Sequence, residues 1–179
     1  MVNATLVSSQ PLERDRDTLY RQAVAELSAA VARVAAGYEA DRELRRDLLQ
    51  DMHTALWRSF ASFDGRCSLK TWTWRVAHNV GASHLGRQRN AKFVGLDDVA
   101  LLAPDDVEAK VEQSRTLERL TRLIHTLQAL DRQLVLLYLE GLDAGSIAEV
   151  TGLSTSNVAT RIHRLKATLA KRFHEGSAS

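Results

Sequence analysis

The feature that most constrains the fold is a stretch near the C-terminus, GLDAGSIAEVTGLSTSNVATRIHRL, at residues 141–165. A short apolar helical pattern is followed by Gly152 and then by a second helical pattern that carries arginines. Glycine is the residue type that a tight turn with positive φ favours. Ala148 stands four positions before this glycine and Val158 six positions after it, which lets two helices cross closely. This spacing is typical of a helix-turn-helix, whose second helix enters the DNA major groove.

The second helix of this pair presents polar and cationic residues outward and no acidic residue. Asparagine and arginine can contact base edges, whereas serine, threonine and lysine can hold phosphates. The alternative is a helical hairpin with a solvated basic face, but the spacing, the turn glycine and the lack of acids together favour DNA binding. The predicted contact residues are Thr155, Ser156, Asn157, Thr160, Arg161, Arg164 and Lys166.

Apolar periodicity predicts helices in the rest of the chain as well. Only nine glycines and two prolines interrupt the 179 residues, which favours helices over a turn-rich β fold. Apolar side chains recur at three- and four-residue spacing, as one buried face of a helix requires. The expected helices span residues 17–37, 42–60, 69–89, 111–130 and 132–140, followed by the helix pair described above.

Short polar residues and glycines mark where these helices should begin and end. Serine and aspartate accept hydrogen bonds from the first backbone N–H groups of a helix, and glycine tolerates the left-handed conformation that often follows the last turn. An Asp-Gly pair indicates a turn. The expected positions are a C-cap at Gly37, a turn at Asp64 and Gly65, and N-caps at Ser68, Asp131 and Asp143.

Charge is distributed in blocks, although the formal net charge is only +2. Residues 66–92 contain six basic residues and no acid, and residues 151–174 contain five basic residues and no acid. Between them, residues 93–113 hold six acids and a single lysine, with Gly95 and Pro104, which is typical of a linker. The sequence predicts an all-α protein of two small helical domains. Its expected parts are a loose tail at 1–16, a first domain at 17–92, a flexible acidic linker at 93–112 and a helix-turn-helix domain at 113–175.

Several classes of protein are disfavoured by the composition. A single cysteine, Cys67, excludes a disulfide framework and a cysteine-rich zinc site. No signal peptide and no run of apolar residues long enough to span a membrane is evident, so we expect a cytoplasmic protein. The chain has no glycine-rich phosphate loop and no paired histidine ligands, and Cys67 and His78 lack a third catalytic partner. We therefore expect no enzymatic activity, no metal and no cofactor.

Two segments of the chain resemble one protein family. GLDAGSIAEVTGLSTSNVATRIHRLKATL is similar to the promoter-binding C-terminal domain of bacterial sigma factors of the extracytoplasmic-function (ECF) group. RDLLQDMHTALWRSFASFDGRCSLKTWTWRVAHNVGASHLGRQR resembles the N-terminal domain of the same family. The two lie in the expected order, with an expected linker between them. The resemblance implies a transcription initiation factor that binds core RNA polymerase, directs it to promoter DNA and helps to open the duplex.

The resemblance also implies a polymerase-docking segment in the second helix. In the family, this segment docks on a coiled coil of the largest polymerase subunit. Taken alone, Asp47 and Asp51 form an i, i+4 acidic pair of the kind usually found on a solvated helix face. The residues that match the docking segment are Asp47, Leu48, Gln50 and Asp51.

In the family, the loop at residues 64–68 and the following helix handle the −10 element. The loop takes up a flipped base and the helix grips the separating strand, which suits aromatic faces, hydrogen-bonding groups and cations. Trp72 shares a face with Val76 and Val80 and is expected in the core, whereas Trp74 is expected to be the more exposed tryptophan. The expected contact residues are Arg66, Ser68, Lys70, Trp74, Arg75, His78, Asn79, Arg87 and Arg89.

One rival interpretation is a two-domain helix-turn-helix regulator that acts without core polymerase. The N-terminal module discriminates the two, because an effector-binding domain would not need an acid-free, tryptophan-rich basic helix. Many relatives are held inactive by an anti-sigma factor that clamps between the two domains, and a flexible linker permits such a partner. The family also implies a place at the nucleoid when the protein is active, with no insertion into a membrane.

Overall fold

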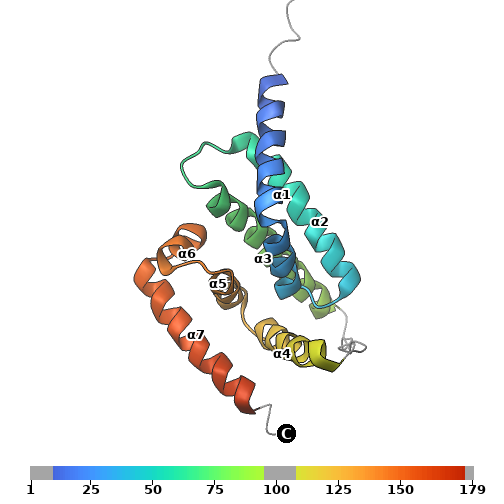
Figure 1. Ribbon diagram of the computed structural model, residues 1–179, viewed down its shortest axis with the longest axis vertical. Helices are drawn as coiled ribbons and strands as arrows, with labels where there is room; N and C mark the ends of the chain where they lie inside the picture. The colour runs from blue at the N-terminus through green and yellow to red at the C-terminus, as the bar shows by residue number, and fades with distance from the viewer. Residues whose placement is uncertain (1–9, 95–107, 176–179) are drawn as a thin grey trace, which may run out of the picture.

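A computed structural model describes the backbone of residues 10–94 and 108–175 and the side chains of residues 15–89 and 115–175. All regular elements in these ranges are helical, which confirms the all-α prediction (Figure 1). No helix within them is both long and apolar enough to cross a membrane. The α-helices are α1 (Gln10–Tyr38), α2 (Arg42–Ser59), α3 (Leu69–Val94), α4 (Glu108–His125), α5 (Ala129–Leu139), α6 (Ala144–Thr151) and α7 (Thr155–Glu175), and a 3-10 turn (Phe60–Ser62) follows α2.

Helices α1, α2 and α3 pack against one another and form the N-terminal domain. The carboxylate of Asp41 caps α2 by accepting hydrogen bonds from the backbone N–H groups of Glu43 and Leu44, at 2.8 and 2.9 Å. Along α2, the side chains of Leu48, Met52 and Leu56 recur at every fourth position and are buried. Their spacing places them on one stripe of the helix, which faces the core of this domain.

Helices α4 to α7 form the C-terminal domain, in which α6 and α7 are the predicted helix-turn-helix. The Asp143 carboxylate accepts a hydrogen bond from the backbone N–H of Ser146 at 2.7 Å and so begins α6. Gly152 ends α6 with a φ of 75°, the left-handed conformation expected for the turn. Ser154 then caps α7, because its Oγ accepts from the N–H of Asn157 at 3.3 Å. The predicted turn and its flanking caps are confirmed.

Some predicted boundaries are wrong. Helix α1 begins at Gln10, inside the expected loose tail, and continues through Gly37 to Tyr38. The helix expected over residues 111–130 ends at His125, because the N–H groups of Thr126 and Leu127 bond back to the carbonyls of Leu123 and Ile124 and close a tight turn. Residues 95–107, most of the expected acidic linker, lie outside the described residues.

The N-cap expected at Asp131 is also wrong, because α5 begins at Ala129 with Gln128 as its N-cap. Asp131 instead lies in the first turn of α5.

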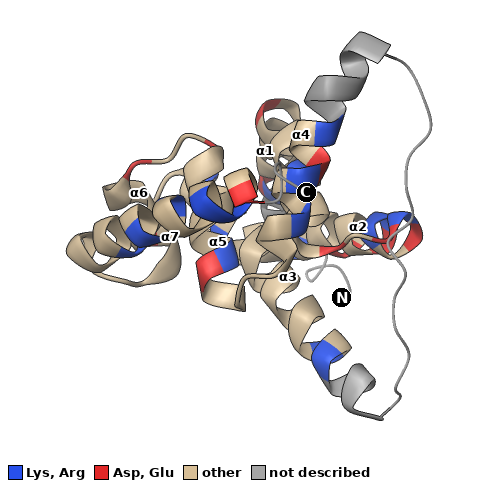
Figure 2. Ribbon diagram, turned by 90° about the horizontal axis from the view of Figure 1, so that it is seen from below, with Lys and Arg blue, Asp and Glu red and all other residues tan. Residues whose placement is uncertain are grey.

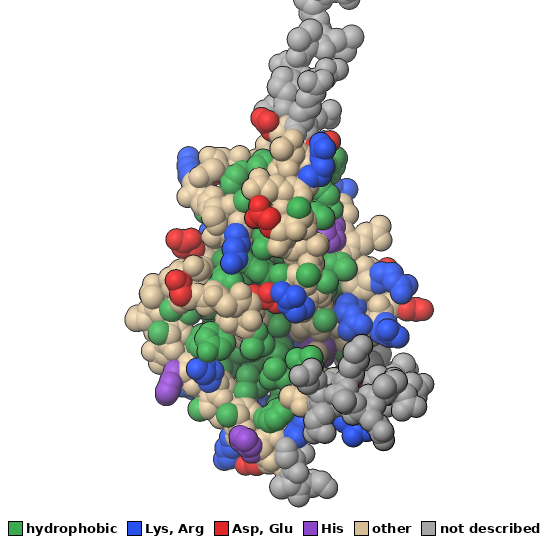
Figure 3. Space-filling model, in the orientation of Figure 1, with side chains coloured by type: hydrophobic (Ala, Val, Ile, Leu, Met, Phe, Trp, Pro, Cys, Tyr) green, Lys and Arg blue, Asp and Glu red, His purple; other side chains and the backbone are tan. Residues whose placement is uncertain are grey.

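The two domains pack against each other through α5 and α6, which contact α3, and through α4 and α5, which contact α1. Helix α5 lies between α7 on one side and α1 and α3 on the other (Figure 1). A Cβ atom added at Gly37 would lie 2.4 Å from Cδ2 of Leu136, far inside contact distance. Gly37 is therefore the residue that lets α1 approach α5 closely, rather than a cap that ends α1. Apolar side chains also gather in the middle of the face shown in Figure 3.

Two glycines of α3 give a matched test of how closely α3 packs against α1. A Cβ at Gly81 would lie 2.5 Å from Cδ2 of the buried Tyr38 ring, whereas a Cβ at Gly86 would meet nothing within 4 Å. Gly81→Ala should lower the free energy of unfolding by about 1–3 kcal/mol through overpacking. Gly86→Ala should raise it by up to ~1 kcal/mol through helix propensity. Denaturant titration of both variants measures this difference, and equal effects at the two positions would contradict the packing described.

Candidate nucleic-acid interface

The outward face of α7 is the exposed surface of the second helix of the helix-turn-helix. The apolar side chains of Val158, Ile162 and Leu165 point inward and are buried. Basic residues are spaced along the helix, as Figure 2 shows, and its first turn contains no acid. A helix N-terminus carries partial positive charge, so this end of α7 favours an anionic partner such as a phosphate. The exposed residues among the predicted contacts are Thr155, Ser156, Asn157, Thr160, Arg164 and Lys166.

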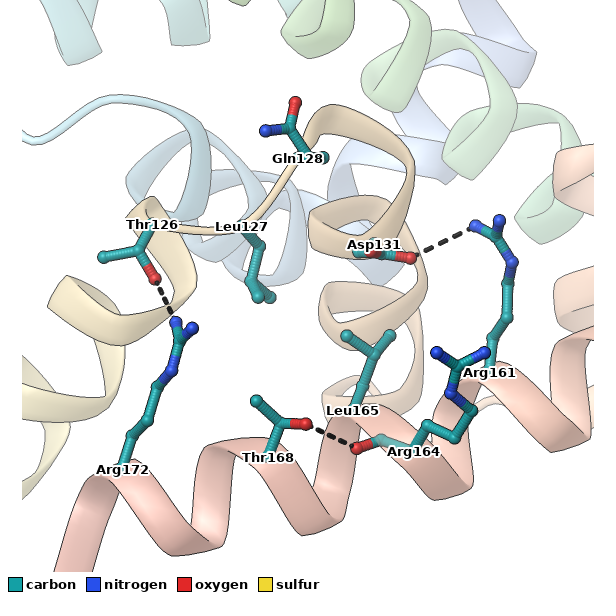
Figure 4. A pocket seen from close by; sticks show the side chains of 9 residues that line it. All are labelled: Thr126, Leu127, Gln128, Asp131, Arg161, Arg164, Leu165, Thr168 and Arg172. Carbon is teal, nitrogen blue, oxygen red and sulfur yellow. Dashed lines mark hydrogen bonds and ion pairs between the residues drawn. The ribbon is translucent and has the colours of Figure 1, made fainter. Parts of the chain in front are cut away.

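Several basic side chains of α7 are held by α5 and by the turn that precedes it. Nη1 of Arg161 lies 3.2 Å from Oδ1 of Asp131, and Nη1 of Arg172 donates to Oγ1 of Thr126 at 3.2 Å (Figure 4). On another side of α7, Nζ of Lys166 donates to the hydroxyl of Tyr138 at 3.2 Å. Arg161 and Arg172 border a cavity of about 330 Å³ between α7 and the turn that joins α4 to α5. Arg161, predicted to point outward, is thus half-buried at the edge of the exposed face.

The second group of predicted DNA contacts lies on the loop before α3 and along α3. Gly65 has a φ of 75°, and the N–H of Arg66 donates to the Asp64 carboxylate at 3.1 Å, so the predicted turn is confirmed. Ser68 caps α3 as predicted, because its Oγ accepts from the N–H of Thr71 at 2.9 Å. The residues of this group whose side chains are exposed are Arg66, Ser68, Lys70, Asn79, Arg87 and Arg89.

The predicted exposure of Trp74 is wrong. Trp74 is 1% exposed and His78 is 0% exposed, so neither side chain can reach DNA in this arrangement. The physical reason is that α3 packs against α1 and α2 of its own domain and also against α5 and α6. Trp72 is only partly buried, and its indole N–H donates to Oγ of Ser59 at 2.9 Å.

His78 has a structural partner inside the molecule. Its Nδ1 lies 3.0 Å from the hydroxyl of Tyr38, and the two rings meet edge to face. Burial lowers the pKa of His78 to about 3 and raises the pKa of Tyr38, since a charged form of either group would lose its hydration. His78 is therefore neutral near pH 7 and acts as a core residue.

The helix-turn-helix covers the beginning of α3. Nη2 of Arg75 donates to the backbone carbonyl of Glu149 in α6 at 2.7 Å. Arg75 was predicted to contact the −10 element, but in this arrangement its guanidinium is bonded to the other domain. An open cavity beside this contact is lined by the loop at residues 65–68 together with Arg75 and Glu149.

The C-terminal end of α1 is held by the corner between α4 and α5. Nε2 of His125 donates to the carbonyl of Ala36 at 2.9 Å, and Nη1 of Arg132 donates to the carbonyl of Tyr38 at 3.4 Å. The last carbonyls of a helix lack partners within it, so both donors supply a missing hydrogen bond. The guanidinium of Arg132 is also a cation at the negative end of the helix dipole. Nearby, Arg33 of α1 forms two hydrogen bonds with the Glu140 carboxylate, at 2.7 and 2.6 Å.

Arg132 is almost fully buried, with 5% of its surface exposed. Besides the Tyr38 carbonyl, its guanidinium donates to the carbonyls of His125 and Leu127 in its own domain. A buried cation is tolerated where such acceptors replace water. Arg132 therefore joins the two domains through backbone groups rather than through a carboxylate.

The predicted polymerase-docking residues of α2 separate into two kinds. Asp47, Gln50 and Asp51 are exposed on the outer face, and the Asp51 carboxylate lies 3.9 Å from the guanidinium of Arg87. Leu48 is 1% exposed and belongs to the inner stripe of α2. The prediction that Leu48 contacts a partner is wrong, because its side chain fills the core.

Fold and surface together define a class: a two-domain helical DNA-binding protein with a helix-turn-helix and a second basic helix. Sequence comparison gives the family. Residues 23–91 match the model described as Sigma-70 region 2, and residues 117–169 match Sigma-70, region 4. Together the two models match more than half of the chain. The chain belongs to the sigma-70 family of RNA polymerase sigma factors, in its ECF group, and acts in transcription initiation.

Similar proteins lie in the same family. RNA polymerase sigma factor YlaC of Bacillus subtilis is 29% identical over 136 residues, which cover 72% of this chain and 77% of YlaC. ECF RNA polymerase sigma factor SigW of the same species is 22% identical, over 72% of this chain and 75% of SigW.

Solved structures show the same fold. CnrH, in complex with the cytosolic domain of CnrY, has a TM-score of 0.65 and 22% identity, and the match covers 92% of this chain and 94% of CnrH. Sigma factor RpoE, in complex with the anti-sigma factor NepR from Bartonella quintana, has a TM-score of 0.65 and 18% identity, over 85% of this chain and 94% of that structure.

Acidification should destabilise the fold through His78. The unfolded histidine titrates near 6.5 and the folded one near 3, so below about 6.5 the unfolded state binds a proton that the folded state does not. Stability from this group is fully present above 6.5 and falls with pH by about 1.4 kcal/mol per unit toward the folded pKa. The free energy of unfolding, measured at several pH values, should fall less steeply in His78→Gln. Identical slopes in the two proteins would contradict a buried neutral His78.

Removing Arg132 should loosen the contact between the domains. In Arg132→Met the side chain keeps much of its apolar length, but the carbonyls of Tyr38, His125 and Leu127 lose their donor. An unpaired buried polar group costs about 1–3 kcal/mol, so we expect lower stability and a larger radius of gyration by small-angle scattering. Arg122→Met, at an exposed position of α4, is the matched control. A variant as stable and compact as the control would show that Arg132 does not join the domains.

Proposed function

We propose that the protein recruits core RNA polymerase through the exposed face of α2 and directs it to promoters by two DNA contacts. In this proposal α7 contacts the upstream (−35) element, and the loop at residues 64–68 together with α3 contacts the −10 element. The observation that carries the proposal is that one chain joins a helix-turn-helix whose second helix has no acid over residues 155–174 to a second basic helix, in the order of sigma regions 2 and 4.

The upstream contact is built by the first half of α7. Thr155 and Ser156 stand at the N-terminus of the helix, where backbone N–H groups and hydroxyls can hold a phosphate. Asn157 and Arg161 carry the side chains that can make paired hydrogen bonds to base edges. Arg164 and Lys166 supply charge to the sugar-phosphate backbone. Support for this role is the exposure of the N-terminal residues and the burial of the opposite stripe of α7.

The −10 contact rests on the exposed members of the predicted group. Arg66 and Lys70 lie at the loop and the start of α3, and Asn79, Arg87 and Arg89 follow along the helix. We assign them to phosphates and sugars of the separating strand, because such contacts need charge and reach rather than burial. Trp74 and His78 maintain the shape of α3 from inside.

Promoter binding requires the two domains to separate at α6. Arg75 is bonded to Glu149 here, so it becomes available to the −10 element only when α6 leaves α3. The sigma factors of similar fold were solved with CnrY and with the anti-sigma factor NepR. We propose an anti-sigma partner for this chain too, one that holds the domains in a closed arrangement.

The remaining assignments complete the proposal. The first domain runs from α1 through α3 and the second from α4 through α7, so α3 and α4 both extend into the linker expected at 93–112, and the connection between the domains is narrowed to residues 95–107. Asp47, Gln50 and Asp51 face the coiled coil of the largest polymerase subunit. We assign the protein to the cytoplasm, at the nucleoid when active, and to no catalytic step of its own.

Reconstitution tests the proposal directly. The protein mixed with bacterial core polymerase should give specific run-off transcripts that neither component gives alone. Asp51→Arg reverses an exposed charge on the face of α2 that docks on polymerase. Holoenzyme formation should weaken roughly tenfold, because the attraction between the Asp51 carboxylate and a complementary charge on polymerase becomes a repulsion. Glu26→Arg makes the same reversal on the exposed surface of α1 and should bind core as the wild type does. Failure of the wild-type chain to bind core at any salt concentration would refute the polymerase role.

A further inference from the structure

Among the described residues, Arg161 is the only predicted contact of α7 whose side chain is paired with a carboxylate. Its Nη1 atom lies 3.2 Å from Oδ1 of Asp131 in α5. Figure 4 shows the arginine extending from α7 toward Asp131 at the start of α5, beside Arg164. The pair is partly exposed, with 40% of the Arg161 side chain and 34% of the Asp131 side chain accessible.

The pairing uses only part of the guanidinium. Arginine has five N–H donors in a planar fork, and the bond to Asp131 engages Nη1. The edge formed by Nε and Nη2 is the pair of parallel donors that matches a phosphate or the O6 and N7 atoms of guanine. A carboxylate on the Nη1 side can therefore orient that edge without blocking it.

Asp131 stands on a rigid support. It belongs to the first turn of α5, where a carboxylate is favoured by the helix dipole and where Gln128 provides no side-chain cap. The next residue, Arg132, is buried and bonded to the carbonyls of His125 and Leu127. The backbone at Asp131 is thus fixed in the C-terminal domain, and with it the position of the carboxylate.

We propose that Asp131 is a positioning residue that orients Arg161 to read one base pair of the upstream promoter element. This inference rests on the proposed function, in which α7 contacts that element. The carboxylate limits the rotamers of a long flexible side chain, so a paired contact with the correct base costs less entropy. It also offsets one positive charge, which weakens the sequence-independent attraction to phosphates.

A purely structural ion pair behaves differently. Partly exposed salt bridges contribute little to stability, so a structural role predicts nearly unchanged folding and unchanged DNA selectivity when Asp131 is neutralised. A positioning role predicts a change in selectivity at one base pair.

The experiment uses the full chain in holoenzyme with core polymerase and a DNA library randomised over the upstream element. Selection with the wild type defines the preferred sequence, and binding is then measured for every single base-pair change. Wild-type protein should discriminate ~10-fold or more at the base pair read by Arg161, and Arg161→Ala should lose that discrimination. Asp131→Asn should lose most of it while binding unrelated DNA more tightly at low salt.

Controls separate orientation from net charge and from folding. Glu175→Gln removes one negative charge from the exposed end of α7 and should keep the wild-type selectivity. Asp131→Ser also removes the carboxylate and should lose the same selectivity, so it serves as the test variant if Asp131→Asn folds poorly. The double variant of Asp131 and Arg161 should match Arg161→Ala alone, since the aspartate acts through the arginine.

Two results would overturn the inference, and they are distinguishable. Wild-type selectivity in both Asp131 variants, with selectivity lost in Arg161→Ala, would reject the positioning role and leave the proposed function intact. No enriched sequence with the wild-type holoenzyme, or no effect of Arg161→Ala, would reject the reading role of α7 itself and the inference with it.

Discussion

The C-terminal end of α1 is a place where helices of both domains of the molecule meet. Its last carbonyls accept hydrogen bonds from His125 and Arg132. Gly37 admits the side chain of Leu136, which any larger residue would displace. One residue later, Tyr38 turns the other way, against Gly81 of α3, and its hydroxyl meets His78. A short segment thus sets the distance from α1 to α5 and from α1 to α3.

The next residue, Glu39, extends the same junction. Its buried carboxylate lies 2.7 Å from Nε2 of His84, accepts a bond from the side-chain amide of Gln88, and also accepts from the backbone N–H of Asp41 at 2.9 Å. It therefore fixes the second half of α3 against the corner between α1 and α2. This contact also determines where Arg87 and Arg89 lie, because both are exposed residues of the part of α3 that Glu39 holds in place.

Features that depend on nearby residues could be predicted from the sequence. Examples are the turn at Gly152, the caps on either side of it, and the cap that Ser68 provides for α3. Each of these hydrogen bonds joins two residues that are three or four positions apart in the sequence, so local spacing determines it. Trp74 could not be placed in this way. Periodicity identifies one apolar stripe, but α3 is covered on more than one side, by α1 and α2 of its own domain and by α5 and α6 of the other. Gly37 was misinterpreted for the same reason, because its constraint is Leu136.

The start of α5 shows how consecutive residues serve two different surfaces. Neighbouring residues on a helix point about 100° apart, so Asp131 faces α7 while Arg132 faces α1. Opening the domains removes the Tyr38 carbonyl from Arg132, but its bonds to His125 and Leu127 lie within the C-terminal domain and remain. The backbone under Asp131 is therefore braced in the closed and the open arrangement alike. In the positioning role proposed above, the orientation of Arg161 then does not depend on whether α6 is docked on α3, because the carboxylate and the arginine both lie in the C-terminal domain.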